Sequence, residues 1–186
     1  MFTSRLVLIV LCSLGIGGGP LAWSHSSPGQ SGNTYGIGQA ATQQEIEAWN
    51  IDINPQGKGL PPGKGSVQEG ETVFLQYCAF CHGATGIEGP NNKLVGGADS
   101  LHTNRPSKTV GSYWPYATTL YDYIFRAMPF TAPQSLTPDQ VYALVAWILF
   151  RNGILEETVT LDAQTLPRVR MPNRAGFVVD PRPDVP

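Results

Sequence analysis

The sequence predicts an all-α domain of three short helices, with an extended arm on either side. Three segments carry apolar residues at helical spacing, and two of them begin with a capping box. The remainder is rich in Gly and Pro, which number 21 and 16 among the 186 residues and favour irregular chain. We therefore expect a helical domain at residues 65–153, an N-terminal arm at 25–64 and a C-terminal tail at 154–186.

The first predicted helix begins after Ser66. Ser66 and Glu69 have the spacing of a capping box, in which each side chain binds the backbone N–H of the other residue. Apolar residues then recur at helical spacing as far as Cys78, and they are Val73, Phe74 and Tyr77. The helix is thus expected to end where the cysteine motif discussed below begins.

The second and third helices are predicted from the same kinds of signal. In YATTLYDYIFRAM the helical stripe is Leu120, Tyr123, Ile124 and Ala127, and the helix should end at Met128 because Pro129 disfavours helical backbone before it. The third helix has Thr137 and Gln140 as a capping box and a stop signal at Asn152-Gly153. A loop of about thirty residues separates the first two helices, which is too long for a compact domain unless it wraps around something. The sequence therefore predicts that another group fills the middle of the domain.

The N-terminus has the pattern of a secretory signal peptide. Arg5 precedes an apolar run at residues 6–18, and Ala22-Trp23-Ser24 offers small residues for cleavage. The run is too short for a comfortable membrane span. We expect residues 1–24 to be removed and the protein to reach the periplasm free of the membrane, with an uncleaved anchor as the alternative. The formal charge of −2 becomes −3 without Arg5, and no basic tract is present, so nucleic acid is not expected as a partner.

The sequence CAFCH, at residues 78–82, is the C-x-x-C-H signature for attachment of c-type haem. The thiols of Cys78 and Cys81 add to the two vinyl groups of the porphyrin. The next residue, His82, can then bind the iron through its neutral imidazole. No other cysteine follows residue 24, so the motif predicts one covalent haem c.

Two cysteines at this spacing have other uses besides haem attachment. A thioredoxin-like redox pair would follow a strand in an α/β pattern, and a zinc site would need more ligands than the remaining His25 and His102. A structural disulfide is compatible with an oxidising compartment and stays open.

The sixth iron ligand is expected to be Met128. It follows His82 by 46 residues, which leaves the chain room to reach the opposite face of the haem, and it lies between two predicted helices that would hold it. Met171 lies in a tail without periodicity, and His102 lies in the Gly-rich loop. Both remain alternatives, as does an open coordination site.

These elements together resemble a class I cytochrome c. The resemblance rests on CAFCH, on Gly89-Pro90 followed by Lys93-Leu94, on RAMPF and on the last helix, TPDQVYALVAWILF. It implies three to five short helices around one covalently bound haem. It also implies that the carbonyl of Pro90 accepts a hydrogen bond from His82, which would orient the imidazole and raise its basicity.

A narrower resemblance covers residues 49–177. The segments WNIDINPQGKGLPPGKGSVQEGE, GSYWPYATTL and LPRVRMPNRAGF are similar to the cytochrome subunits of periplasmic sulfite or sulfane-sulfur dehydrogenases. This resemblance implies a molybdenum-containing dehydrogenase as electron donor and a downstream cytochrome c or oxidase as acceptor. Some members carry two haems, whereas this sequence has a single C-x-x-C-H motif.

Two features have more than one interpretation. Trp114 either packs over the haem edge or donates its indole N–H to a haem propionate. The arms either pack on the helical domain or dock onto a partner.

The sequence thus predicts a periplasmic monohaem cytochrome that carries single electrons. We expect it to be a non-catalytic electron-transfer subunit of an oxidoreductase complex. Service to another periplasmic dehydrogenase, such as a quinoprotein alcohol dehydrogenase, is the first alternative, because partner choice depends on surface complementarity. A haem enzyme with an open sixth site and a purely structural haem subunit are the others.

Overall fold

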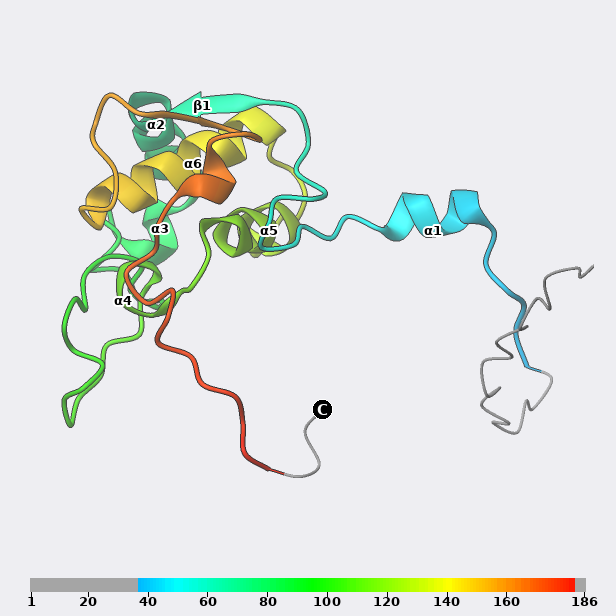
Figure 1. Cartoon of the computed structure of the whole chain (residues 1–186). Helices are drawn as coiled ribbons and strands as arrows, with labels where there is room; N and C mark the ends of the chain where they lie inside the picture. Colours follow the sequence, from blue (N-terminus) through cyan, green and yellow to red (C-terminus); the bar gives the residue numbers. More distant parts are fainter. Residues whose placement is uncertain (1–36, 183–186) are drawn as a thin grey trace, which may run out of the picture. The chain divides into compact units, whose positions relative to one another are not determined.

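A computed structural model of the chain describes residues 37–182, so the predicted signal peptide and the first part of the N-terminal arm lie outside the described residues. The helices and strands belong to a unit that starts at residue 41. In chain order they are α1 (Gln43–Trp49), β1 (Lys64–Ser66), α2 (Val67–Tyr77), α3 (Ala79–His82), α4 (Val110–Tyr113), α5 (Ala117–Ala127), α6 (Pro138–Arg151), β2 (Thr160–Asp162) and the 3-10 turn η1 (Leu166–Arg168). Helices dominate this part of the chain, which confirms the predicted all-α class (Figure 1).

Helices α2 and α6 cross closely because Gly70 has no side chain. A Cβ atom at Gly70 would collide with the carbonyl oxygen of Ala143 and lie 2.7 Å from the Cβ of Trp147. Next to the crossing the rings of Phe74 and Trp147 stack, with their centroids 4.0 Å apart. Both aromatic side chains are buried, so the crossing forms the centre of the hydrophobic core.

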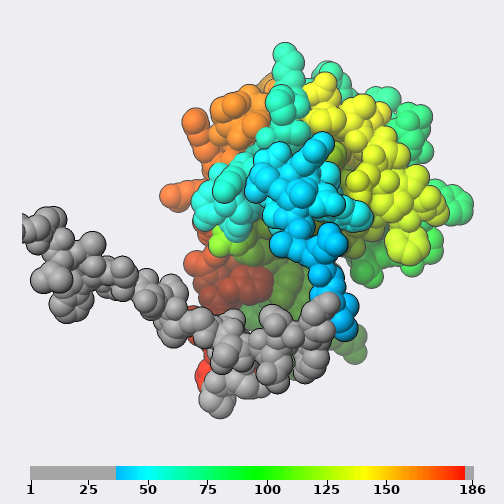
Figure 2. Space-filling model, turned by 90° about the vertical axis from the view of Figure 1, so that its right-hand side faces the viewer, coloured from blue at the N-terminus to red at the C-terminus, as the bar shows by residue number. Residues whose placement is uncertain are grey.

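The predicted helix ends are confirmed. Both capping boxes are present, at Ser66/Glu69 and at Thr137/Gln140. Helix α5 ends with Met128 as its C-cap, in extended backbone, as the following proline requires. The loop between α5 and α6 and the start of α6 lie at the surface, where they are yellow in Figure 2.

Parts of both predicted arms pack into the domain. Strand β1 pairs antiparallel with β2, with Gly65 opposite Leu161. The core includes Ile53 from the N-terminal side, and Leu161, Leu166 and Met171 from the C-terminal side. These strands are three residues long, too short to produce a readable alternation of apolar residues. The arms therefore help to complete a core that three short helices alone would leave small.

Two short helices lie in segments where no helix was expected. Helix α1 begins at a capping box in which Thr42 Oγ1 accepts from the N–H of Glu45, so the Thr-x-x-Glu pattern was the available signal. Helix α4 is a single turn inside the long loop, capped by Thr109. Asn152 ties this loop to α6, because its side chain donates to the Leu94 carbonyl at 3.1 Å. Because α1 is a helix, the N-terminal arm is not extended throughout.

Candidate haem site

The C-x-x-C-H residues form a tight turn at the junction of α2 and α3. Cys78 is both the C-cap of α2 and the N-cap of α3, and its N–H donates to the carbonyl of Phe74 at 2.9 Å. The N–H groups of Cys81 and His82 both donate back to the Cys78 carbonyl, at 3.1 and 3.0 Å. Since Phe74 is fully buried, this turn is tied to the core on one side.

The imidazole of His82 is oriented by the carbonyl of Asn92, and not by that of Pro90 as the resemblance implied. Nδ1 of His82 lies 2.9 Å from this carbonyl oxygen. The N–H of Asn91 donates to the Cys81 carbonyl at 2.9 Å, so the chain turns back at Asn91 and the carbonyl after it reaches the ring. A carbonyl oxygen only accepts, so Nδ1 carries the proton and Nε2 keeps its lone pair for a metal.

The two cysteines are free thiols, and both are half-buried. Burial, and to a smaller extent the neighbouring Cys81, raise the pKa of the Cys78 thiol to about 12. Cys78 packs against the hydrophobic core. The Cys78 thiol is therefore neutral near pH 7 and lies in apolar surroundings, and the two cysteines are not joined as a disulfide.

Met128 lies at the end of α5, where its N–H donates to the Ile124 carbonyl at 3.0 Å. Its side chain is half-buried and packs against the core. Two residues earlier, Arg126 contacts both carboxylate oxygens of Asp122 at 2.7 Å and one of Asp52 at 3.0 Å. Asp122 also accepts from the N–H of Ile53 at 3.2 Å. The last turn of α5 is thus tied to the segment that precedes β1.

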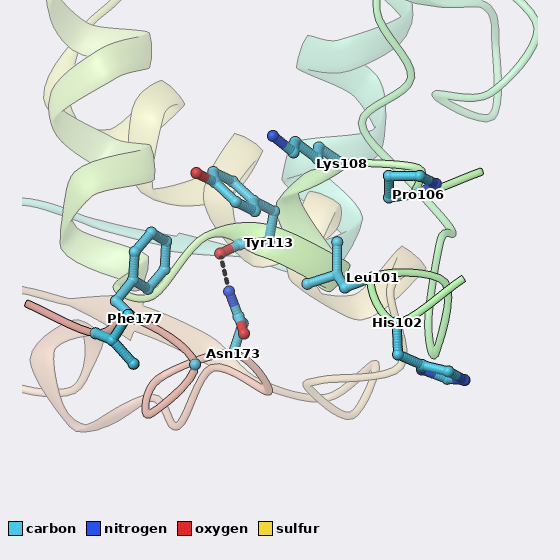
Figure 3. Close-up of a pocket in the computed structure, with 9 residues that line it drawn as sticks. Leu101, His102, Pro106, Lys108, Tyr113, Asn173 and Phe177 are labelled. Atoms are coloured by element: carbon cyan, nitrogen blue, oxygen red, sulfur yellow. Dashed lines mark hydrogen bonds between the residues drawn. The ribbon is translucent and has the colours of Figure 1, made fainter. Parts of the chain in front are cut away.

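The two alternative iron ligands lie in different surroundings. Met171 is 3% exposed and belongs to the hydrophobic core, so it is held firmly, contrary to what its place in the tail suggested. His102 is exposed and lines an open groove of about 540 Å³ beside Tyr113 and Asn173. In Figure 3 the His102 ring points away from both of these residues. The groove has none of the C-x-x-C-H residues in its lining.

Trp114 packs edge to face with Tyr123, with ring centroids 5.6 Å apart and an angle of 84° between the rings. This contact involves only protein side chains, so packing over the haem edge and a bond to a propionate both stay predictions. The C-terminal tail contacts the same region, because the Asn173 side chain donates to the Tyr113 carbonyl at 2.8 Å and the Arg174 guanidinium lies 3.9 Å from the Tyr116 ring centre. Tail residues therefore cover the segment around Trp114.

Known proteins share this arrangement. Among solved structures, the chain is similar to a chain of the sulfane dehydrogenase SoxCD from Paracoccus pantotrophus, with 43% sequence identity and a TM-score of 0.73 over 80% of this chain and 74% of that chain. Residues 65–148 also match the family model described as cytochrome C oxidase, cbb3-type, subunit III. The chain belongs to the cytochrome c family. A search of curated proteins gave no significant match for this cytochrome.

Cytochromes of this family carry haem c, and the described residues fit that group. The two unpaired thiols suit covalent attachment of the porphyrin, and the imidazole with a free Nε2 suits the iron. The half-buried Met128 offers a thioether as a candidate second ligand. Among residues 37–182 no cluster of three or more His, Cys, Asp or Glu side chains offers a site for a separate metal ion. Within the same range no helix has both the length and the apolar character needed to cross a bilayer.

Sequence reasoning did not find two parts of this site. The Asn92 carbonyl is a backbone group, and no side-chain pattern identifies which carbonyl of a loop will reach an imidazole. The Asp122–Arg126 pair has the i, i+4 spacing of a helical ion pair and was readable. Its extension to Asp52 depends on the packing of the arm and has no local signal.

Proposed function

We propose that the cytochrome is an exported monohaem electron carrier, in which Cys78 and Cys81 attach the haem and His82 and Met128 bind its iron. The observation that carries the proposal is the His82–Asn92 hydrogen bond of 2.9 Å, because it leaves Nε2 free beside two unpaired thiols. Cys78 and Cys81 would hold the haem through two thioethers, each made by addition of a thiol S–H across a vinyl double bond, with sulfur on one carbon and hydrogen on the other. Bound haem supplies an iron that takes up and gives up one electron.

The chain's own residues account for the other requirements of a carrier. The Asn92 carbonyl holds the imidazole proton on Nδ1, which raises the basicity of Nε2. The thioether of Met128 is a soft ligand that favours the reduced iron and so raises the potential. If His82 and Met128 both bind the iron, no coordination position would be left for a substrate, and the protein would act as an electron carrier and not as a catalyst.

We further propose that the electron donor is a molybdenum-containing sulfite or sulfane dehydrogenase. The support is the 43% identity to a chain of a sulfane dehydrogenase, over 80% of this cytochrome. A downstream cytochrome c or oxidase would then accept the electron. The single C-x-x-C-H in the sequence means that the same haem must receive and donate it.

The test uses the full-length holoprotein and the purified molybdenum subunit from the same source. Sulfite or a sulfane-sulfur substrate is added, and the appearance of the reduced haem spectrum is followed. We expect reduction that depends on both the substrate and the molybdenum subunit. A haem that dithionite reduces but this mixture does not would reject the donor, while leaving the ligand assignment to be judged from the ferric spectrum.

A further inference from the structure

Helix α1 has an apolar face that nothing in the described chain covers. All of its residues are exposed, and Trp49 and Ile46 show 85% and 46% of their surface. These two side chains are three residues apart, so they share one side of the helix. Gln44 lies on the other side. The helix, blue in Figure 2, is therefore amphipathic but buries no side chain.

A helix of this length needs an external contact to be stable. It has seven residues, whereas isolated helices shorter than about 12–15 residues are marginal in water. Its capping box satisfies the first N–H groups but adds no apolar burial. A large aromatic side chain such as Trp49 can bury about 150–250 Å² on contact with another surface. We therefore expect α1 to form fully only when its apolar face is covered.

The surroundings of the helix specify the chemistry of what covers it. A hollow of about 570 Å³ runs along the apolar face, and its lining comprises Ala41, Glu45, Ile46, Trp49, Asn50 and Asp52. The acidic residues of this lining are Glu45 and Asp52, the second of which also pairs with Arg126, and residues 37–57 contain no Lys, Arg or His. The complementary surface is thus an apolar pocket with Lys and Arg at its rim.

The likeness to a chain of a solved sulfane dehydrogenase extends into the N-terminal arm. That likeness covers 80% of the cytochrome, and residues 65–186 amount to only about two thirds of the chain. It must therefore include part of the N-terminal arm, which lies outside the cytochrome family segment at 65–148. From residue 37 onward, the arm is first bonded to the domain at Asp52 and Ile53, through Arg126 and Asp122, just after α1 ends.

We propose that α1 is a docking helix for the catalytic subunit of the dehydrogenase, with Trp49 and Ile46 inserted into an apolar pocket rimmed by basic residues. This inference rests on the proposed function, because it takes that subunit as the partner. The anchor at Asp52 keeps the helix close to the domain that carries the haem motif. Docking would thus hold the two proteins together while leaving the haem motif free for electron transfer.

The experiment compares the holoprotein with the double variant Ile46→Ala/Trp49→Ala and with the control Gln44→Ala, which changes the opposite side of α1. Affinity for the purified catalytic subunit is measured by titration calorimetry at low and high salt. We expect the double variant to bind at least tenfold more weakly, because aromatic anchors dominate interfaces. The control should stay within twofold, and wild-type affinity should fall as salt screens the acidic rim.

Hydrogen exchange supplies a second readout. The backbone amides of Glu47, Trp49 and Asn50 should exchange more slowly when the catalytic subunit is added, and this protection should be absent in the double variant. Reduction by dithionite and the ferric spectrum should be unchanged in all variants, because α1 contributes nothing to the haem site.

Three outcomes would overturn the docking role, and they are distinguishable. Equal affinity of the wild type and the double variant, with substrate-dependent reduction intact, would reject the helix but keep the proposed function. A concentration-dependent wild-type dimer that the double variant loses, with its affinity for the catalytic subunit unaffected, would assign α1 to a second copy of the chain. A wild type that neither binds the subunit nor is reduced by it would reject both proposals.

Discussion

The Nη1 atom of Arg126 lies 3.0 Å from a carboxylate oxygen of Asp52, a residue 74 positions earlier in the chain. The same guanidinium contacts Asp122, which also accepts from the N–H of Ile53. One arginine thus joins the N-terminal arm to the last turn of α5, two residues before Met128. The pKa of Arg126 is raised, chiefly by its hydrogen bond to the Asp122 side chain, so it stays charged at any physiological pH.

We predict that Arg126→Gln loosens Met128 without removing it. Each ion pair is partly exposed, so the loss in the free energy of unfolding should be only about 1 kcal/mol. The end of α5 would move more freely, and added imidazole should displace the sixth ligand several-fold faster, as measured by stopped-flow absorbance of the ferric protein.

The control for this change is Arg182→Gln, which breaks the exposed Arg182–Asp180 pair in the C-terminal tail. Its displacement rate should equal that of the wild type. An Arg126→Gln protein with an unchanged rate would mean that packing alone holds Met128, and that the arm contributes nothing to its position.

The crossing of α2 and α6 gives a second prediction, because Gly70→Ala would place a Cβ against the backbone of Ala143. Alanine favours a helix over glycine by about 1 kcal/mol. Backbone cannot move aside as a side chain can, so the overpacking should exceed this gain and leave a net loss of about 1–3 kcal/mol. Chemical denaturation of the ferric holoprotein measures the change.

Gln76→Ala is the matched control, since Gln76 is exposed on the same helix. It should change the free energy of unfolding by no more than about 0.5 kcal/mol. If Gly70→Ala were as stable as the wild type, the two helices would have to lie further apart than they do here.

Local signals predicted much of the fold and most of the candidate site. Capping boxes and the proline after Met128 gave the helix ends, and the C-x-x-C-H motif placed three donors within five residues. Long-range packing was not readable. The burial of Met171, for example, depends on a tail that folds back over the domain. Irregular chain has no periodic pattern of apolar residues from which such burial could be predicted.

The turn after β2 predicts a specific response to acid. The carboxylate of Asp162 accepts from the Thr165 hydroxyl at 2.8 Å and from the N–H groups of Thr165 and Gln164 at 2.8 and 2.9 Å. These bonds, of which that from the Thr165 side chain has the largest effect, lower the pKa of Asp162 below its ordinary value of 3.8. A lowered pKa means that the charged form stabilises the fold above pH 3.8 and that this contribution is lost as pH falls through the lower folded value.

We therefore expect Asp162→Asn to be less stable than the wild type at neutral pH, with the difference shrinking as pH falls below 3.8. Urea titrations between pH 7 and pH 3 would measure both proteins. Asp180 offers a control, because its pKa is lowered by Arg182 in the exposed tail, where Asp180→Asn should leave the stability of the domain nearly unchanged. A constant difference between wild type and Asp162→Asn across this range would show that the charge of Asp162 is irrelevant.

The two Met-Pro pairs provide the sharpest test of the iron ligand. Met128→Leu and Met171→Leu both keep an apolar side chain of similar volume, so each should cost less than about 1.5 kcal/mol through packing. Only Met128→Leu removes the sulfur that we assign to iron. We expect the Met-to-iron charge-transfer band of the ferric protein to vanish in Met128→Leu and to persist in Met171→Leu.

Truncation separates the two roles further. Met171 is 3% exposed in the core, so Met171→Ala should lower the free energy of unfolding by about 2–5 kcal/mol while the band remains in the folded protein. Met128 is only half-buried, so Met128→Ala should cost less through packing but should make the ferric iron bind cyanide readily. If the band were lost in Met171→Leu and unchanged in Met128→Leu, the buried Met171 would be the iron ligand. A band absent from the wild type itself would instead point to His102 as the ligand or to an open site, and only the open site would make the haem able to bind substrate.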